Sequence, residues 1–453
     1  MTIERNRDLE NDDKRYIWHP FTQMQVYVRE KPLIIEEGEG CILKDVDGNR
    51  YIDGVSSLWT NVHGHREEKL DRAITDQLGK IAHSTLLGLS NIPAIRLAKR
   101  LIEIAPRGLT KVFYSDNGST ANEIALKMAF QYHRQAPSGN RNKKKFIRLS
   151  NAYHGDTVGS VSIGGIDLFH SMYKDLLFPS FKVNAPYCYR CELGSSYPAC
   201  RLKCLQQMEE IMKVHHHEVA ALVIEPMVQG AGGILIQPPG YLQEVRELCT
   251  RYHVFMIADE VAVGFGKTGK MFACEHERVV PDIMALAKGI TGGYLPLAAT
   301  LVTEEIYAGF LGEHEEFKTF FHGHTFTGNP LACAVALANL DIFEEEHTID
   351  NLRDKIAHLT EKLKPFDTLP HVGEVRQCGI MVGVELVSDK DTKELFAPKE
   401  RIGHKVITEA RKRGVIIRPL GDVLVLMPPL SISLAEIDHL CEAAYNSIRV
   451  VTE

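Results

Sequence analysis

The chain has 453 residues, of which 44% are apolar and 25% are charged, a balance typical of globular proteins with a large core. Its formal net charge of −7 gives no indication of nucleic-acid binding, and no apolar run reaches the roughly 18 residues of a membrane-spanning helix. The first residues are polar and charged and lack the apolar core of a secretory signal. We therefore expect a cytosolic protein of two or three domains, with no nucleic-acid or membrane partner.

A β-hairpin is the first element that the sequence predicts. Asp47-Gly48 is a turn dipeptide, and it separates two strand-like runs within residues 40–54, GCILKDVDGNRYIDG. Further along, short apolar runs alternate with segments of helical spacing, such as Asn122–His133 and Tyr241–Tyr252. That alternation is typical of a parallel α/β sheet. Five runs predict its buried strands: Val112–Tyr114, Phe146–Leu149, Ala220–Ile224, Phe255–Ala258 and Ile283–Ala287.

After about residue 340 the pattern changes to a helix, then short strands, then another helix, which is typical of an α+β domain. The sequence therefore predicts an α/β fold with two domains. The large domain, residues 66–340, has a mostly parallel sheet flanked by helices. The smaller α+β domain is built from both termini, with residues 1–65 contributing a segment to residues 341–453.

Four of the ten cysteines cluster as C-x2-C followed by C-x3-C. In a cytosolic protein, such cysteines are thiols or metal ligands more often than disulfides. A loop of reduced thiols is the simpler interpretation, and a structural metal site is the alternative. The cluster comprises Cys188, Cys191, Cys200 and Cys204.

Three predicted strands end in charged residues. Glu225 follows one strand, Asp259 ends the next, and Lys288 follows the third. Ligands of open α/β sheets bind outside the carboxyl ends of the strands. A buried salt bridge would explain any one acid–lysine pair. A pyridoxal phosphate site explains all three, because a lysine holds that cofactor as a Schiff base and an aspartate pairs with its pyridinium nitrogen.

A phosphate site is also predicted, in the segment FYSDNGSTANEIALKMA. A strand runs into Gly118 and Ser119, and a helix begins at once. Backbone N–H groups at a helix N-terminus bind phosphate. Ser119 or Thr120 is a natural N-cap, with Glu123 placed for a capping box if Thr120 is the cap. Capping and phosphate binding are compatible.

The segment GFGKTG, Gly264 to Gly269, matches the dinucleotide-binding pattern G-x-G-x-x-G, but the match is weak because no clear helix start follows. It also nearly matches a P-loop, except that Val261 stands where the first glycine should be. We reject both nucleotide interpretations.

The combination of Gly118-Ser119, Asp259 and Lys288 resembles the class III aminotransferases of the pyridoxal-phosphate fold type I superfamily. The resemblance covers nearly the whole chain. It is carried by NAYHGDT, IEPMVQGAGG, IADEVAVGFGKTGKMFACEH, PDIMALAKGITGG and FFHGHTFTGNPLACA, in that order. It implies a homodimeric transaminase with pyridoxal phosphate as cofactor and active sites shared between the subunits.

The resemblance also implies roles for single residues. Lys288 binds the cofactor and moves a proton, and Asp259 pairs with the pyridine nitrogen. Arg418 binds the carboxylate of a keto acid. The implied cofactor-binding residues are Gly118, Ser119, Tyr153, His154, Glu225, Asp259, Lys288, His324 and Thr325, with Thr325 coming from the other subunit. The implied substrate-binding residues are Phe21, Trp59, Tyr153, Lys288, Gly323 and Arg418.

The segments YIWHPFTQM and RPLGDVLVLMPP are similar to a branch of that family that acts in biotin synthesis. This similarity implies amination of 8-amino-7-oxononanoate, with adenosylmethionine or lysine as the amino donor. Members that use adenosylmethionine carry tyrosine at Phe21 and Val425 and tryptophan at Leu58, and all three positions line their substrate cleft. The alternatives are a class III enzyme acting on an ω-amino acid or diamine, a non-catalytic pyridoxal-phosphate regulator, and a cysteine–metal scaffold protein.

Overall fold

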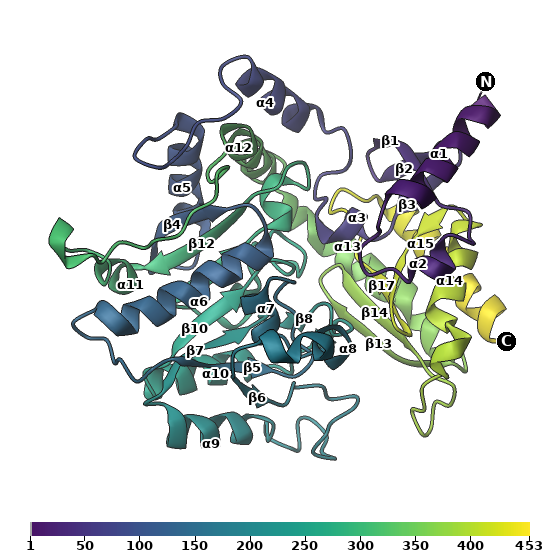
Figure 1. The fold of residues 1–453 in the computed structure, drawn as a ribbon. Helices are drawn as coiled ribbons and strands as arrows, with labels where there is room; N and C mark the ends of the chain where they lie inside the picture. Colours follow the sequence, from purple (N-terminus) through teal and green to yellow (C-terminus); the bar gives the residue numbers. More distant parts are fainter. Residues whose placement is uncertain (1) are drawn as a thin grey trace.

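The computed structural model describes residues 2–453 and shows two lobes side by side (Figure 1). The larger lobe contains a seven-stranded sheet, and the smaller lobe contains both chain termini. The sheet order is β4 (Leu109–Ser115), β12 (Ala298–Thr303), β11 (Ile283–Leu286), β10 (Phe255–Asp259), β7 (Val219–Ile224), β5 (Lys145–Leu149) and β6 (Phe181–Val183).

Strands β11, β10, β7, β5 and β6 run parallel, whereas β12 is antiparallel to both of its neighbours. All six residues of β7 are buried, because helices cover both faces of the sheet. Helix α6 (Gly118–Gln135) packs on one face, against Val223 and Ile257. The other face is covered by α5 (Ile92–Ile104), α9 (Leu205–His215), α10 (Tyr241–Arg251) and α12 (Pro330–Glu345). The predicted α/β sheet is confirmed.

The large lobe also contains shorter helices around its rim. Helix α4 (Glu68–Leu78) packs against α12, and α7 (Val158–Ser162) packs against α6. The remaining ones are α8 (Asp167–His170) and α11 (Glu304–Ala308). A two-stranded ribbon, β8 (Val228–Gln229) and β9 (Leu235–Ile236), follows Glu225.

The predicted hairpin is present in the small lobe. Strands β2 (Ile42–Asp45) and β3 (Arg50–Asp53) are antiparallel, and Gly48 has a φ of +86° in the turn, where glycine avoids steric strain. Strand β1 (Ile35–Glu39) extends this sheet on one side and β15 (Val415–Ile416) pairs parallel to β3 on the other. One sheet therefore joins the N-terminal and C-terminal parts of the chain, as the sequence predicted.

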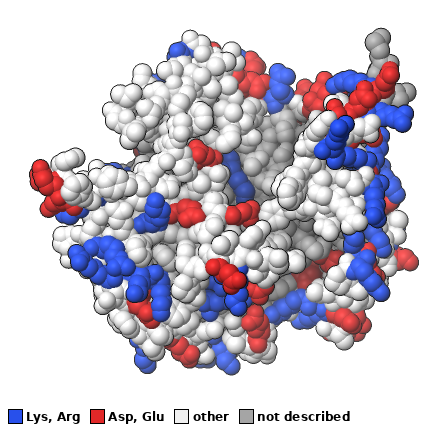
Figure 2. Space-filling view, in the orientation of Figure 1, with Lys and Arg blue, Asp and Glu red and all other residues white. Residues whose placement is uncertain are grey.

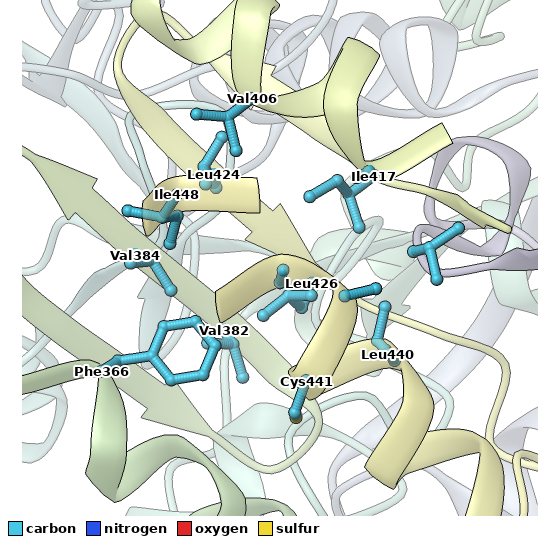
Figure 3. Close-up of a cluster of buried hydrophobic side chains, with 14 of the residues drawn as sticks. Phe366, Val382, Val384, Val406, Ile417, Leu424, Leu426, Leu440, Cys441 and Ile448 are labelled. Atoms are coloured by element: carbon cyan, nitrogen blue, oxygen red, sulfur yellow. The ribbon is translucent and has the colours of Figure 1, made fainter. Parts of the chain in front are cut away.

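A second sheet in the small lobe has the order β13 (Val372–Cys378), β14 (Met381–Leu386), β17 (Val423–Leu426) and β16 (Arg418–Leu420). Val382 and Leu426 from this sheet lie against Leu440 and Ile448, and Phe366 closes the cluster (Figure 3). The helices of this lobe are α1 (Thr2–Tyr16), α2 (Met24–Tyr27), α3 (Ser56–Trp59), α13 (Thr348–Leu363), α14 (Ile402–Arg411) and α15 (Leu434–Thr452).

The predicted limits of the domains, at residues 65 and 340, remain predictions, and the second of them falls inside α12. Among residues 2–453, no helix combines the length and apolar character needed to cross a membrane. On the face shown in Figure 2, Lys and Arg side chains are interspersed with Asp and Glu, and the surface is hollowed between the two lobes.

Candidate active site

Three charged side chains meet at the carboxyl edge of the large sheet. Glu225 follows β7, Asp259 ends β10, and Lys288 lies two residues beyond β11. Because these strands are parallel neighbours, their ends lie next to one another. All three residues line one cavity of about 730 Å³, within the size range of small-molecule sites. The juxtaposition that the sequence predicted is therefore present.

Asp259 is held by three hydrogen bonds. Its Oδ2 accepts from Nδ1 of His154 at 2.7 Å and from Nδ2 of Asn122 at 2.9 Å, and its Oδ1 accepts from the backbone N–H of Val261 at 3.1 Å. Both His154 and Asp259 are almost fully buried. The carboxylate is therefore fixed in direction, and its charge is stabilised by donors.

Asn122 was missed by sequence reasoning. It lies on α6, one turn after Gly118, and its amide also donates to the backbone carbonyl of His154 at 3.0 Å. Its side chain is 1% exposed. The available signal was its position: a polar residue on the buried side of a helix whose neighbours there, Ala121 and Ile124, are apolar.

Lys288 lines the cavity and is partly buried. Burial lowers the pKa of its amine below the ordinary value, and the nearby carboxylates of Asp259 and Glu225 act in the opposite direction. Its backbone φ is +48°, in the left-handed region that non-glycine residues rarely adopt. The Nζ atom lies 4.9 Å from the centre of the Trp59 ring. Such backbone strain is typical of functional sites.

Glu225 is also buried, and its carboxylate orients two backbone segments. It accepts from the N–H of Tyr153 at 3.1 Å and from the N–H of Gly230 at 2.8 Å. Burial raises the pKa of Glu225 to about 7, with Asp259 adding to the shift and His154 opposing it. Glu225 therefore fixes the loop that carries Tyr153 at the edge of the cavity.

The N-cap of α6 differs from the sequence prediction. Asn117 is the cap, and its Oδ1 accepts from the N–H of Thr120 at 3.0 Å. Asparagine is as good a cap as serine, and the helix begins two or three residues earlier than predicted. Glu123 is too far along the helix for a capping box and accepts instead from the N–H of Gly159 at 2.7 Å.

The first turn of α6 forms a cradle beside Asp259. A Cβ atom at Gly118 would lie 2.5 Å from the Val261 side chain, and one at Gly155 would lie 2.2 Å from Oγ of Ser119. Glycine is therefore required at both positions. Ser119 also bonds Thr157, with 2.9 Å between the two hydroxyl oxygens. The free N–H groups at this helix end point into a site suited to a phosphate group.

Of the remaining predicted substrate residues, Arg418 and Phe21 are not among those that line the cavity. Trp59 and Tyr153 are among its lining residues. Arg418 is the first residue of β16 and is half-buried, and burial lowers the pKa of its guanidinium. Phe21 is 60% exposed, and its ring packs edge-on against Phe169, with 5.3 Å between the ring centres.

The two other positions that distinguish adenosylmethionine users differ in exposure. Leu58 is 47% exposed, beside Trp59. Val425 is fully buried, pairs with Arg418 across β16 and β17, and belongs to the same apolar cluster as Trp59. Neither residue, nor Phe21, is among the residues that line the cavity around Lys288.

The segment that carries Gly323, His324 and Thr325 is not brought to the Lys288 cavity of its own chain. Gly323 and His324 line a separate hollow together with Leu87. His324 Nδ1 lies 2.7 Å from Oδ2 of Asp116. The assignment of Gly323, His324 and Thr325 to an active site therefore stays a prediction.

The four clustered cysteines surround one small cavity of about 20 Å³, space for a single water-sized body. They lie in the irregular segment between β6 and α9. Within the part of the chain that the structure describes, no three His, Cys, Asp or Glu side chains are placed to hold a metal ion. The segment is tied to the small lobe by Arg190, whose Nε lies 2.6 Å from Oε1 of Glu385.

Comparison with known proteins places this site in a family. The family model for aminotransferase class-III matches residues 24–448. The chain belongs to the class-III aminotransferase family. The fold and the aminotransferase activity that the resemblance implied are thereby confirmed.

This aminotransferase has close relatives along its whole length. It is 59% identical over 449 residues to the adenosylmethionine-8-amino-7-oxononanoate aminotransferase of Nitratidesulfovibrio vulgaris. The matched region covers 99% of this chain and 83% of that relative. A crystal structure of the enzyme of that name from Methanocaldococcus jannaschii is 47% identical, with a TM-score of 0.93 over 98% of this chain and 99% of that one. The omega transaminase of Pseudomonas jessenii in complex with PMP is 34% identical, with a TM-score of 0.93 over 98% of both chains.

The cofactor of this aminotransferase is pyridoxal phosphate. The residues present fit it. The cavity joins an amine with a lowered pKa, a fixed carboxylate and an anion-binding helix end, and Cβ atoms at Gly118 and Gly155 would clash. The buried Nε2 of His154 has no partner among residues 2–453 and lies in the same wall. Lys288, Asp259 and the Gly118-Ser119 turn would hold the amine-reactive carbon, the ring nitrogen and the phosphate.

Proposed function

We propose that this aminotransferase transfers an amino group to the ketone of 8-amino-7-oxononanoate and forms 7,8-diaminononanoate in biotin synthesis. The observation that carries the proposal is the 59% identity, over nearly the full chain, to a relative named for that substrate. A cavity of about 730 Å³ that holds Lys288 and Asp259 supports it. The cytosolic location predicted from the sequence stays part of the proposal.

The chemistry divides between the cofactor and the chain. When bound, pyridoxal phosphate supplies an electron sink for the carbanion that forms when the donor carbon loses its proton. Nζ of Lys288, whose pKa is lowered by burial, would accept that proton from the donor carbon and deliver it to the cofactor. Asp259, fixed by Asn122 and His154, keeps the ring nitrogen protonated.

Arg418 orients the acceptor. Its guanidinium is half-buried near Tyr153, and burial lowers its pKa without removing the charge. A guanidinium matches a carboxylate with two parallel hydrogen bonds. We assign Arg418 to the carboxylate of the keto acid. The ketone, near the other end of the substrate molecule, then reaches Lys288.

The amino donor is tested directly by absorbance. We expect the visible band of the cofactor-loaded protein to disappear when adenosylmethionine or lysine is added alone, because each half of a ping-pong reaction proceeds without the other substrate. The donor that discharges the band is then mixed with 8-amino-7-oxononanoate, and 7,8-diaminononanoate is measured by mass spectrometry.

The outcomes separate the candidates. Discharge by adenosylmethionine alone shows that Phe21, Leu58 and Val425 are compatible with that donor. If only lysine removes the visible band, we infer that these three positions determine which amino donor is used. Loss of the band with ω-amino acids, together with failure to aminate the oxononanoate, contradicts the proposed substrate and favours an ω-amino acid aminotransferase.

We further propose a homodimer in which each cavity receives Gly323 and Thr325 from the partner. Support comes from exposed apolar side chains near these residues. Phe321 is 74% exposed and Leu87 is 89% exposed, and their segments face a common hollow. Exposed apolar patches of this kind mark interaction surfaces.

A mixed dimer tests the shared site. Gly323 has free space around its Cβ position within its own chain, so Gly323→Trp should leave that subunit folded while filling the partner's cavity. We expect Lys288→Ala and Gly323→Trp each to be inactive alone. In an equal mixture that exchanges subunits, about half of the dimers are mixed, and one of the two sites in each mixed dimer keeps both Lys288 and the partner's Gly323. The mixture should therefore recover about a quarter of wild-type activity. A mixture that stays inactive, or a Gly323→Trp homodimer that stays active, contradicts the shared site.

A further inference from the structure

Lys267 is a buried lysine without a role in the mechanism. It lies in the GFGKTG segment, between β10 and the 3₁₀ turn Ala273–Glu277, and is 1% exposed. Its Nζ donates to Oγ of Ser56 at 2.8 Å, to the carbonyl of Asn61 at 2.9 Å and to the carbonyl of Pro428 at 3.3 Å. All three acceptors are uncharged. Enclosing an ammonium group without a carboxylate contact is costly, so the position calls for a specific purpose.

The acceptors of Lys267 come from two distant parts of the chain. Ser56 and Asn61 flank Trp59 on the N-terminal segment, whereas Pro428 follows β17 near the C-terminus. Ser56 also donates to the carbonyl of Met427 at 2.6 Å, so the same hydroxyl links both parts. Lys267 therefore joins the large lobe to the two chain ends that form the small lobe.

The segment that Lys267 holds is strained. Ser56, Ser57 and Trp59 have φ values of 51°, 61° and 64°, all in the left-handed region and none of them glycine. Such conformations persist only where surrounding contacts enforce them. Two of the three bonds from Lys267 bracket this stretch, one at Ser56, its first residue, and one at Asn61, just after its end.

The strained segment positions Trp59 in the cavity. Trp59 is 6% exposed, its ring centre lies 4.9 Å from Nζ of Lys288, and a Cβ atom at Gly230 would come within 3.1 Å of the ring. The indole is thus wedged between the reactive lysine and the loop after Glu225. A small shift of residues 56–61 would move this wall relative to Lys288.

We propose that Lys267 is a positioning residue: its ammonium group holds the strained Ser56–Asn61 segment so that Trp59 forms a fixed wall of the substrate cavity beside Lys288. Lys267 acts through Trp59 and does not contact the substrate. The inference rests on the proposed function only in taking the Lys288 cavity as the substrate site, whichever donor is used.

The two tryptophans of the chain make this testable by fluorescence. Trp18 is 87% exposed, so Trp18→Phe leaves Trp59 as the sole indole. In this background we expect Lys267→Met to shift Trp59 emission to the red and to increase its quenching by acrylamide, in protein with and without cofactor. We also expect kcat/KM to fall about 10- to 100-fold, mostly through KM, because displaced binding walls cost affinity. Lys267→Arg, which keeps the charge, should restore most of both properties.

Lys143 supplies the matched control. It is also buried, donates to the carbonyl of His253, and lies at the opposite edge of the sheet. Lys143→Met should lower the melting temperature without moving Trp59 emission or KM. If Lys267→Met leaves emission and KM unchanged, or if Lys143→Met changes them equally, the positioning role is wrong.

If Lys267→Met does not fold, Ser56→Ala decides the question, because it removes one acceptor and keeps the lysine. It should shift the emission in the same direction by a smaller amount. An unchanged emission in a folded Ser56→Ala protein overturns the inference. Emission does not depend on which substrate is used, so this test fails or succeeds independently of the proposed donor and acceptor.

Discussion

Lys288→Ala should lower turnover by at least about 10⁴-fold, because the variant loses both the covalent anchor of the cofactor and the base that moves the proton. The environment of the amine suits this role: partial burial lowers its pKa, and Lys288, with its strained backbone, lines the cavity. The measurement is product formation over hours at saturating donor and acceptor. Absorbance of the variant loaded with cofactor reports whether binding survives without the covalent bond.

Lys270→Ala is the control for this variant, since Lys270 is exposed and lies outside the cavity lining. It should keep wild-type kcat and KM. Circular dichroism of both variants should match the wild type. Turnover by Lys288→Ala within tenfold of wild type would show that the transfer uses another base and that the assigned mechanism is wrong.

Asp259→Asn should bind the cofactor about 10- to 100-fold more weakly, which corresponds to the 1.5–3 kcal/mol of a hydrogen bond to a charged group. Turnover should fall further, by more than about 10²-fold, because the ring nitrogen loses its proton and the electron sink is weakened. The asparagine also brings an N–H donor among three existing donors, His154, Asn122 and Val261, so one of them loses its partner. Equilibrium dialysis and single-turnover absorbance measure the two effects separately.

Asp282→Asn is the matched control for Asp259→Asn. Asp282 is also hydrogen-bonded, since its Oδ2 lies 2.7 Å from Nη1 of Arg246. It precedes β11 and therefore lies at the opposite edge of the same sheet. Its substitution should change stability and leave cofactor affinity unaltered. Normal turnover in Asp259→Asn would remove the role assigned to that carboxylate.

The charged strand ends were predictable because two local patterns coincide there. Apolar runs predict where the parallel strands lie. A charged residue at the end of such a run departs from the apolar pattern and indicates a candidate site. Glu225, Asp259 and Lys288 were found in this way, and the hairpin turn at Asp47-Gly48 was found from its dipeptide. The identity of the reaction came from the family resemblance and not from these patterns.

Contacts between distant residues were not predictable. Lys267 bonds Ser56, 211 positions away in sequence, and no local pattern reports such a contact. The glycine-rich pattern around Lys267 resembles nucleotide-binding loops, and nothing in that pattern indicates a buried structural lysine. Asn122 was missed for a related reason, since an asparagine on a helix also suits an exposed face. The cap at Asn117 was misplaced because Asn117, Ser119 and Thr120 all have suitable side chains, and the backbone decides among them.

The sheet that joins the two ends of the chain has a consequence for synthesis. Strand β3 leaves the ribosome early. Its partner β15, in which Val415 pairs with Ile52, follows about 360 residues later. At the usual translation rates of about 5–20 residues per second, the edge of β3 waits roughly 20 to 70 s for its partner. Throughout that interval the nascent chain presents an unpaired strand edge, the kind of surface that chaperones protect from aggregation. The small lobe is thus the last part of the protein to be completed, although it contains the first residues to be made.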